Sequence, residues 1–508
     1  MLTLINPPSI KTLQGLQMQS PNPPLGLAYI AGAVRKAGLP YHVIDATGEA
    51  LDLIAPYPAQ DKFRVQGMRF DDIVARIPAE TRIVGLHCNF SHLWPLTRMV
   101  AERVRAAFPE ALLVLGGEHG TAVYDHVLKN SPIDAVVLGE GDRTVLDLVA
   151  AQEAGQELSS VGGIAYRDGD GAIRTTGLST RIREVDELPW PDWDSFPIRE
   201  YIDRHQINGM NIGRSMPLLA TRGCPYQCTF CSNPFMWTRR YVMRDPKRIV
   251  DEMAHYMAKY DVVNFDFQDL TAIVNYRWAT ALCEEIIGRG LEITWQLPSG
   301  TRSEVFDEKL LRLMHRAGCR ALSFAPESGS EEILESVKKQ VDLDSLIEAV
   351  TLAVKADLKV SCFFVIGFPK DRPDTLRQTM TLIRKIALIG VHDVSVTKFV
   401  PYPGSELFRA LQRSGKIDMD DTFFVSPMEF YTSDAPSYAD AISSRRLYRT
   451  MLWMFVNFYV LSFLTHPIRT AQILFSAAFK GVEGARYAKW FVDRFFVRRR
   501  WRQMTQSG

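Results

Sequence analysis

The sequence carries no excess of charge of either sign. Its 59 lysines and arginines and 58 aspartates and glutamates give a formal net charge of +1. No overall field therefore draws the chain to nucleic acid, and we expect no nucleic-acid partner. Only 7 cysteines occur in 508 residues, which argues against a disulfide scaffold and favours a reducing cytoplasm. The amino terminus has no basic segment ahead of its first apolar run, so we expect no signal peptide.

Long apolar runs are also missing. Residues 451–464 are uncharged, but a spanning helix needs about twenty such residues, so this run is too short. Hydrophobic residues make up 46% of the chain and charged residues 23%, the proportions of a soluble globular protein. A length of 508 residues exceeds what one compact core can hold and predicts about three domains.

Three of the few cysteines stand in one short loop. Cys224, Cys228 and Cys231 have the spacing C-x3-C-x2-C. Three thiolates at this spacing can hold three irons of a [4Fe–4S] cluster and leave the fourth iron open to a ligand. The alternatives are a zinc site or three unrelated buried thiols. Zinc would require a fourth cysteine or histidine at a second pair spacing, and none follows closely.

The first 150 residues alternate short apolar runs with helical patterns. This alternation predicts an α/β fold with a doubly wound, Rossmann-like parallel sheet. Such sheets bind ligands at the carboxyl ends of their strands. No G-x-G-x-x-G follows the first strand, which argues against a nicotinamide cofactor. Two glycine-containing segments stand at predicted strand ends: Gly116, Gly117 and Glu118, and then Gly139, Glu140 and Gly141.

The remaining chain divides into three predicted parts. Residues 151–215 predict a linker with a small hairpin about residues 168–171. Residues 216–411 repeat strand and helix patterns about six times, which predicts a partial (β/α)6 barrel of the TIM type. Residues 412–508 predict a helical C-terminal region.

Polar residues follow the predicted barrel strands. Asp269, Arg302, Glu327 with Ser328, and Gly367 each come after a different strand. The chemistry of such a barrel gathers at the carboxyl ends of its strands, so we expect these residues to share one site. The alternative for each charged residue alone is a solvated or ion-paired loop position.

The cysteine spacing resembles the signature of the radical S-adenosylmethionine (SAM) enzymes. In that family the amino and carboxylate groups of SAM bind the fourth iron, and an electron from the cluster releases a 5′-deoxyadenosyl radical. The N-terminal segments, in their order, resemble the cobalamin-binding domain that precedes many radical SAM barrels. The overall pattern is similar to the group that contains class B methyltransferases and the anaerobic magnesium-protoporphyrin monomethyl ester cyclase. Residues 237–247 are similar to the corresponding stretch of that cyclase.

The resemblance implies roles for the candidate residues. Asp269 would meet the SAM amino group, and Arg302 would meet the SAM carboxylate or a substrate acid. Glu327, in a Glu-Ser-Gly run with Ser328, would accept hydrogen bonds from the ribose. Gly367 would let the backbone flank the adenine. Phe230, inside the cysteine loop, is a further candidate cofactor contact, and the two glycine-containing segments would contact cobalamin.

One departure concerns the cobalt ligand. Cobalamin domains that bind cobalt through histidine carry Asp-x-His-x-x-Gly after the first strand, whereas residues 9–15 contain no histidine. The chain therefore either binds cobalamin without a histidine ligand, which we favour, or has lost this cofactor. His87 and His119 stand at strand ends and could face the cofactor. The alternative is that both are hydrogen-bonded loop histidines.

The C-terminal residues are aromatic and basic. Two interpretations stay open: contact with an anionic membrane surface at the inner face of the membrane, or a helix packed over the barrel mouth with a charged outer face. The basic residues are Arg469, Lys480, Arg486, Lys489, Arg494, Arg498, Arg499, Arg500 and Arg502.

The favoured function is methylation of an unactivated carbon on a lipid-like, tetrapyrrole or natural-product substrate, with cobalamin as methyl carrier. A flavodoxin or ferredoxin type of donor would supply electrons. One alternative is an oxidative cyclase of the magnesium-protoporphyrin type. Another is a non-catalytic iron–sulfur or cobalamin sensor. In every case the cofactors would carry the chemistry, and the protein would position them and exclude water.

Overall fold

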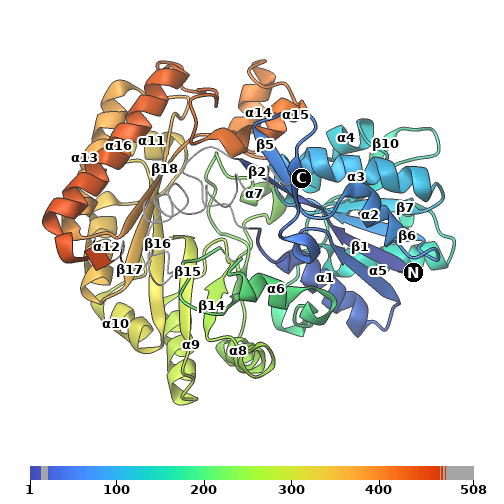
Figure 1. The fold of residues 1–508 in the computed structure, drawn as a ribbon, viewed down its shortest axis with the longest axis horizontal. Coiled ribbons are helices and arrows are strands. Elements are labelled where there is room, and N and C mark those ends of the chain that lie inside the picture. The colour runs from blue at the N-terminus through green and yellow to red at the C-terminus, as the bar shows by residue number, and fades with distance from the viewer. Residues whose placement is uncertain (13–20, 207, 470, 473–474, 476–508) are drawn as a thin grey trace.

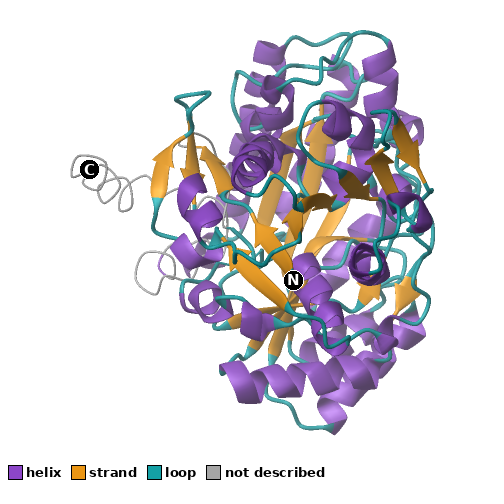
Figure 2. Ribbon diagram, turned by 90° about the vertical axis from the view of Figure 1, so that its right-hand side faces the viewer, coloured by secondary structure: helices purple, strands orange, loops and turns teal. Residues whose placement is uncertain are grey.

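The computed structural model describes residues 1–12, 21–206, 208–469, 471–472 and 475. Over these residues the chain forms two α/β units that lie side by side, one on a seven-stranded sheet and one on a six-stranded sheet (Figure 1). Figure 2 shows the strands of both units covered by helices. The predicted α/β fold is confirmed.

The first unit contains a largely parallel sheet with the order β10-β9-β8-β7-β6-β1-β3. Strand β1 is buried along its whole length, as expected where helices cover both faces of a sheet. The predicted hairpin forms as β9 and β10, and it extends this sheet by antiparallel pairing with β8. The strands are β1 (Leu2–Asn6), β3 (Tyr41–Asp45), β6 (Ile83–His87), β7 (Leu112–Gly116), β8 (Ala135–Val137), β9 (Ile164–Arg167) and β10 (Ile173–Thr175).

Helices accompany this sheet, with α1 packed beside α5 and α2 beside α3. They are α1 (Leu25–Lys36), α2 (Phe70–Ala75), α3 (Trp94–Ala107), α4 (Glu118–Lys129) and α5 (Gly141–Glu153). A three-stranded antiparallel sheet, absent from the sequence prediction, is added by β2 (Ser9–Thr12), β4 (Ile54–Pro56) and β5 (Phe63–Gln66). Phe63 of this sheet packs in one apolar cluster with Val425 and Met428, far along the chain.

The second unit is an open, barrel-like sheet of six parallel strands in sequence order, β11-β14-β15-β16-β17-β18. The strands are β11 (Ser215–Leu218), β14 (Asn264–Phe267), β15 (Thr294–Thr301), β16 (Cys319–Glu327), β17 (Lys359–Ile366) and β18 (Asp393–Lys398). The helices between them are α8 (Pro246–Tyr260), α9 (Tyr276–Gly288), α10 (Glu308–Arg316), α11 (Glu331–Ser336), α12 (Leu343–Lys355) and α13 (Pro373–Ile389). The predicted six βα repeats are confirmed.

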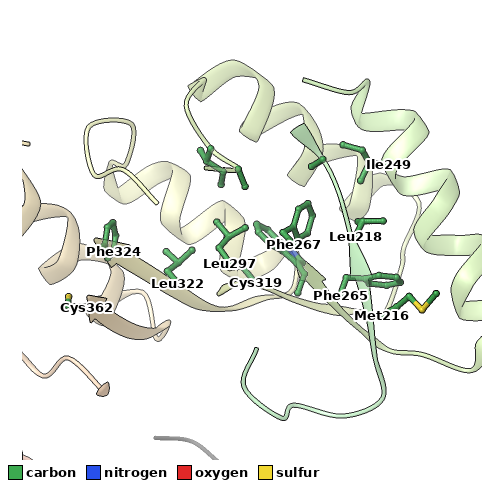
Figure 3. Packing of buried hydrophobic residues seen from close by; sticks show 14 of the residues in the cluster. Met216, Leu218, Ile249, Phe265, Phe267, Leu297, Cys319, Leu322, Phe324 and Cys362 are labelled. Atoms are coloured by element: carbon green, nitrogen blue, oxygen red, sulfur yellow. The ribbon is translucent and has the colours of Figure 1, made fainter. Parts of the chain in front are cut away.

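The two faces of this sheet differ in polarity, because successive side chains of a strand point to opposite sides. Large apolar side chains such as Met216, Phe265 and Phe324 pack with Ile249 of α8 in one core (Figure 3). The residues that alternate with them are buried and polar, and therefore face the inside of the barrel. They are Asp266, Gln296, Ser323, Ser361 and Ser395.

The described part of the C-terminal region is helical, as predicted. It contains α14 (Glu406–Arg413), α15 (Asp421–Val425) and α16 (Ser444–Thr465). Helix α15 returns to the first unit, where Asp421 pairs with Arg98 of α3 at 2.8 Å. Helix α16 packs along α13 and β18. Its 22 residues begin ahead of the uncharged run, so by length and composition alone it could cross a membrane, although 33% of its most apolar window is buried against the protein.

Candidate active site

The cysteine loop leaves and rejoins the barrel at one place. Strand β12 (Thr221–Arg222) enters the loop, β13 (Val242–Met243) leaves it, and the two pair in antiparallel fashion. Gly223 follows β12 with φ +87°, and a Cβ there would lie 2.1 Å from the carbonyl oxygen of Arg240. Only glycine fits this turn. The loop also contains the short helix α7 (Asn233–Met236).

The loop covers a cavity of about 360 Å³ at the carboxyl ends of the barrel strands. This is the place where a barrel of this kind holds its reacting groups. The cavity is lined by Cys224, Tyr226, Cys228, Phe230, Cys231, Asn233, Leu270, Thr271, Gly300, Arg302, Ala325, Glu327, Lys339, Phe363, Phe364, Val365, Ser395 and Thr397.

All three loop cysteines carry free thiols and face this one cavity. Burial raises the pKa of each thiol, so metal binding must displace their protons. Within the described ranges, no three His, Cys, Asp or Glu side chains are placed to hold a single metal ion. An iron–sulfur cluster binds each thiolate to a different iron and so holds its ligands further apart. The donor set therefore fits a cluster and gives the zinc alternative no support.

Arg302 presents unused hydrogen-bond donors to the same cavity. Its side chain is only 6% exposed, and its Nε and Nη1 atoms have no hydrogen-bond partner among the residues that the structure describes. Its guanidinium lies over the ring of Tyr226, 4.0 Å from the centroid, while Nη2 pairs with Glu304 at 3.0 Å. A buried guanidinium with free donors suits a carboxylate ligand, as the amino-acid end of SAM provides.

Glu327 pairs with a lysine that the sequence analysis missed. Lys339 Nζ lies 2.9 Å from Glu327 Oε1, and both side chains are 9% exposed. Burial lowers the pKa of Lys339, but the charges of Glu327 and Cys228 raise it above its ordinary value overall. The lysine therefore stays protonated and places a positive charge between Glu327 and the cysteines. Nothing in the sequence distinguishes Lys339 from its exposed neighbour Lys338.

Three predicted SAM contacts lie outside the lining of this cavity. Asp269 is buried and accepts hydrogen bonds from the amide of Ala220 and from the hydroxyl of Thr221, at 3.1 and 2.6 Å. Ser328 Oγ lies 3.1 Å from the hydroxyl of Thr379. A Cβ on Gly367 would lie 2.4 Å from a methyl group of Leu447, on helix α16. Their roles toward SAM stay predictions, and in this geometry each one supports the surrounding structure.

The first glycine-containing segment connects the end of β7 to the start of α4, and Gly116 and Gly117 carry no side chains there. Gly117 has φ +112°, and a Cβ there would lie 2.5 Å from the carbonyl oxygen of Cys88. At Gly116, in contrast, a Cβ would meet no atom of the described residues within 4 Å. The half-buried backbone at Gly116, which carries no side chain, therefore fits the close approach of a large flat ligand such as cobalamin. Glu118 continues toward the cysteine loop, where its carboxylate accepts a hydrogen bond from the hydroxyl of Ser232.

The second segment makes a buried ionic contact between the two units. Arg222, directly before Gly223, pairs with Asp142 through two bonds of 2.8 and 3.1 Å and with Glu140 at 3.2 Å. Arg181 holds the second oxygen of Glu140 at 2.5 Å. Glu140 thus has partners other than cobalamin. Its glycine neighbours also contact protein: a Cβ on Gly139 would meet Ser179, and one on Gly141 would meet Ile30.

His119 is buried and His87 is half-buried, and burial lowers the pKa of both rings. His87 shares a hydrogen bond of 3.2 Å with Asn6, and burial lowers its pKa to about 4. His119 is stacked on Trp94, with 5.2 Å between ring centroids, and burial lowers its pKa to about 3. The Nε2 atom of each has no partner within the described residues. For His119 the enclosure by aromatic rings favours the structural alternative.

Comparison with known proteins finds two matching families, one for each α/β unit, and several similar enzymes. Residues 218–383 match the radical SAM superfamily and residues 15–149 match the B12 binding domain. The anaerobic magnesium-protoporphyrin IX monomethyl ester cyclase of Rubrivivax gelatinosus is 31% identical, with coverage of 80% of this chain and 69% of the relative. An uncharacterized methyltransferase of Pyrococcus horikoshii is 29% identical, with coverage of 80% and 82%. The cytidylyl-2-hydroxyethylphosphonate methyltransferase of Streptomyces wedmorensis is 28% identical, with coverage of 79% and 80%.

Solved structures share the arrangement of both units. The methyltransferase TsrM of Kitasatospora setae, with cobalamin and a [4Fe–4S] cluster bound, matches with a TM-score of 0.64 at 14% identity, over 91% of this chain and 88% of that one. The enzyme OxsB, with aqua-cobalamin and SAM bound, matches with a TM-score of 0.63 at 17% identity, over 89% and 60%. At these identities the likeness establishes the fold.

The fold and the cysteine-lined cavity together define a radical SAM enzyme. The chain belongs to the family of radical SAM enzymes in which a B12-binding domain precedes the barrel. Its cofactors are a [4Fe–4S] cluster, SAM and cobalamin.

Proposed function

We propose that this protein transfers a methyl group to an unactivated carbon of an apolar, lipid-like, tetrapyrrole or natural-product substrate in the cytoplasm. The proposal is carried by one contact, the hydrogen bond from Ser232 to Glu118. Ser232 follows Cys231, and Glu118 follows the bare backbone of Gly116 and Gly117. The segment that would hold cobalamin therefore touches the loop that would hold the cluster, so a substrate between them could reach both.

Bound cluster and SAM supply a hydrogen-abstracting 5′-deoxyadenosyl radical, and bound cobalamin supplies the methyl group. Overall, a substrate C–H bond becomes a C–CH3 bond. One SAM leaves as methionine and 5′-deoxyadenosine, which retains the substrate hydrogen, and a second SAM leaves as S-adenosylhomocysteine. A reducing donor of the flavodoxin or ferredoxin type supplies the electrons.

The residues of the chain bind and orient these groups. Arg302 binds the SAM carboxylate through its Nε and Nη1 atoms. Glu327 accepts hydrogen bonds from the ribose, while Lys339 pairs with one of its carboxylate oxygens and fixes its position. Asp269 holds the backbone from which the cysteine loop starts. Phe230, with the aromatic and aliphatic side chains of β17, gives the cavity an apolar wall that excludes water and suits an apolar substrate.

The second candidate is an oxidative cyclase, favoured by the 31% identity to the Rubrivivax enzyme. The two reactions differ in their by-products. Methyl transfer yields S-adenosylhomocysteine and a methylated product, whereas cyclisation yields neither. A sensor that does not cleave SAM is the third candidate.

The test is anaerobic purification and cluster reconstitution, followed by incubation with dithionite, SAM and hydroxocobalamin. Mass spectrometry measures 5′-deoxyadenosine and S-adenosylhomocysteine, and visible spectra follow the bound cobalamin. A Cys228→Ala variant is the control. We expect both SAM products in the native protein and no 5′-deoxyadenosine in the variant. 5′-Deoxyadenosine without cobalamin methylation would favour the cyclase, and no 5′-deoxyadenosine in either sample would favour the sensor.

A further inference from the structure

Helix α16 is apolar on two opposite faces. Its inner face, with Met451, Met454 and Phe458, is buried in the barrel core. A surface helix of a globular protein normally has a polar outer face. The outer side chains of α16 are instead large, apolar and about half or more exposed: Trp453 at 56%, Val456 at 47%, Val460 at 51%, Phe463 at 53% and Leu464 at 69%.

These five residues form one stripe, because steps of three, four and seven residues return to the same side of a helix. Figure 1 shows α16 beside α13 at the outer edge of the barrel unit. Leu388, at the end of α13, is 54% exposed, and Ile468, just beyond α16, is 75% exposed. Contiguous exposed apolar surface of this kind marks an interaction site.

The same helical face begins with three arginines. Arg445, Arg446 and Arg449 are exposed and lie one to two turns before Trp453. None of them forms an ion pair with the part of the chain that the structure describes. Cations are unfavourable at a helix N-terminus, where the macrodipole is positive, and this first turn has no acidic residue to compensate. The arginines therefore serve no evident purpose in the stability of the helix.

The charge of the sequence around α16 has the same sign. From residue 469 onward there are nine lysines and arginines but only two acidic residues, Glu483 and Asp493. Because the whole chain has a net charge of only +1, the preceding residues are net acidic. Along the sequence, positive charge is thus concentrated in the residues that follow the apolar stripe.

We propose that the outer face of α16 rests on an anionic lipid bilayer. Trp453, Val456, Val460, Phe463 and Leu464 would enter the boundary between headgroups and acyl chains, and the three arginines would meet the lipid phosphates. The helix lies on the membrane and does not span it, because its inner face is part of the barrel core. This inference does not depend on the methyl-transfer proposal.

The test is co-sedimentation of the full-length protein with vesicles of phosphatidylcholine alone and with vesicles that contain phosphatidylglycerol. One variant combines Trp453→Gln with Phe463→Gln, and a second combines Arg445→Gln with Arg446→Gln. The matched control is Leu178→Gln, an apolar residue with 46% exposure after β10. Circular dichroism checks that each variant keeps its fold.

We expect the native protein and the control to bind anionic vesicles at least about tenfold more strongly than neutral ones, and each double variant to lose about tenfold in affinity. Binding should weaken with added salt. Equal binding by the native protein and the Trp453 and Phe463 double variant would overturn the proposal. Absence of binding to anionic vesicles would also overturn it, as would a dimer that this variant dissociates, because the stripe would then join two copies.

Discussion

Replacement of Arg222 by methionine should destabilise the contact between the two α/β units. The Arg222 side chain is 5% exposed and the side chains of Asp142 and Glu140 are 6% and 1% exposed. Its guanidinium also lies 4.9 Å from the ring centroid of Tyr29. Methionine preserves most of the apolar stem but leaves Asp142 buried without its cation. Removal of one partner from a buried pair costs about 3–5 kcal/mol, so we expect a loss of unfolding free energy of this size.

Urea denaturation monitored by tryptophan fluorescence measures this loss. Arg174→Met is the matched control, because Arg174 pairs with Asp168 at 2.8 Å while 61% exposed, and such surface pairs contribute at most about 1 kcal/mol. Addition of Asp142→Asn to Arg222→Met should recover part of the loss, since it removes the stranded charge while Glu140 keeps Arg181. If Arg222→Met shifts the unfolding midpoint no more than the control does, the ionic contact does not stabilise the junction.

Three further outcomes are expected. Burial raises the pKa of Asp266 from 3.8 to about 7, so its contribution to stability is complete below about pH 4 and is lost as the pH rises through about 7. Asp266→Asn should therefore flatten the dependence of the urea midpoint on pH over this range. Parallel pH profiles of the variant and the native protein would contradict the raised pKa of Asp266. Gly117→Ala should lower the unfolding free energy by about 1–3 kcal/mol, because alanine is strained at a positive φ. Gly116→Ala should leave the unfolding free energy unchanged and weaken cobalamin binding, as measured by a spectral titration. Equal losses of stability in the two variants would be inconsistent with the two backbone geometries. Lys339→Met should weaken SAM binding about tenfold, which corresponds to about 1.4 kcal/mol, without changing the iron content. Calorimetry measures the SAM affinity and iron analysis measures the cluster content. Unchanged SAM affinity would show that Lys339 is not part of the site.

Local pattern was sufficient to predict the repeated βα units. The alternation of polar and apolar residues in strands such as β14, all of them buried, and the amphipathic pattern of the helices between the strands are properties of neighbouring residues, which a sequence displays directly. The small sheet of β2, β4 and β5 was missed for the opposite reason. Its strands are short, and they are stabilised by contact with Val425 and Met428, which no local pattern reveals.

The same distinction holds in the site. The cysteine spacing is local, and all three thiols do face one cavity with Arg302 and Glu327. The contacts of Glu140 could not be predicted from the sequence, because its partner Arg222 is 82 residues away in the chain. A buried ion pair between distant segments has no signature in one sequence. The role expected for Glu140 therefore came from the strand end it follows, while its observed contacts come from the packing of the two units.

The pairing of β12 with β13 has a consequence for how the enzyme matures. These strands bring Thr221 opposite Met243 and Arg222 opposite Val242, so protein hydrogen bonds alone close the ends of the cysteine loop. The entropy of loop closure is thereby lost when the chain folds and not when iron arrives. In zinc fingers, by contrast, metal binding and folding are a single event. We therefore expect this chain to reach its final shape first and to accept its cluster afterwards, as a late insertion into a finished pocket.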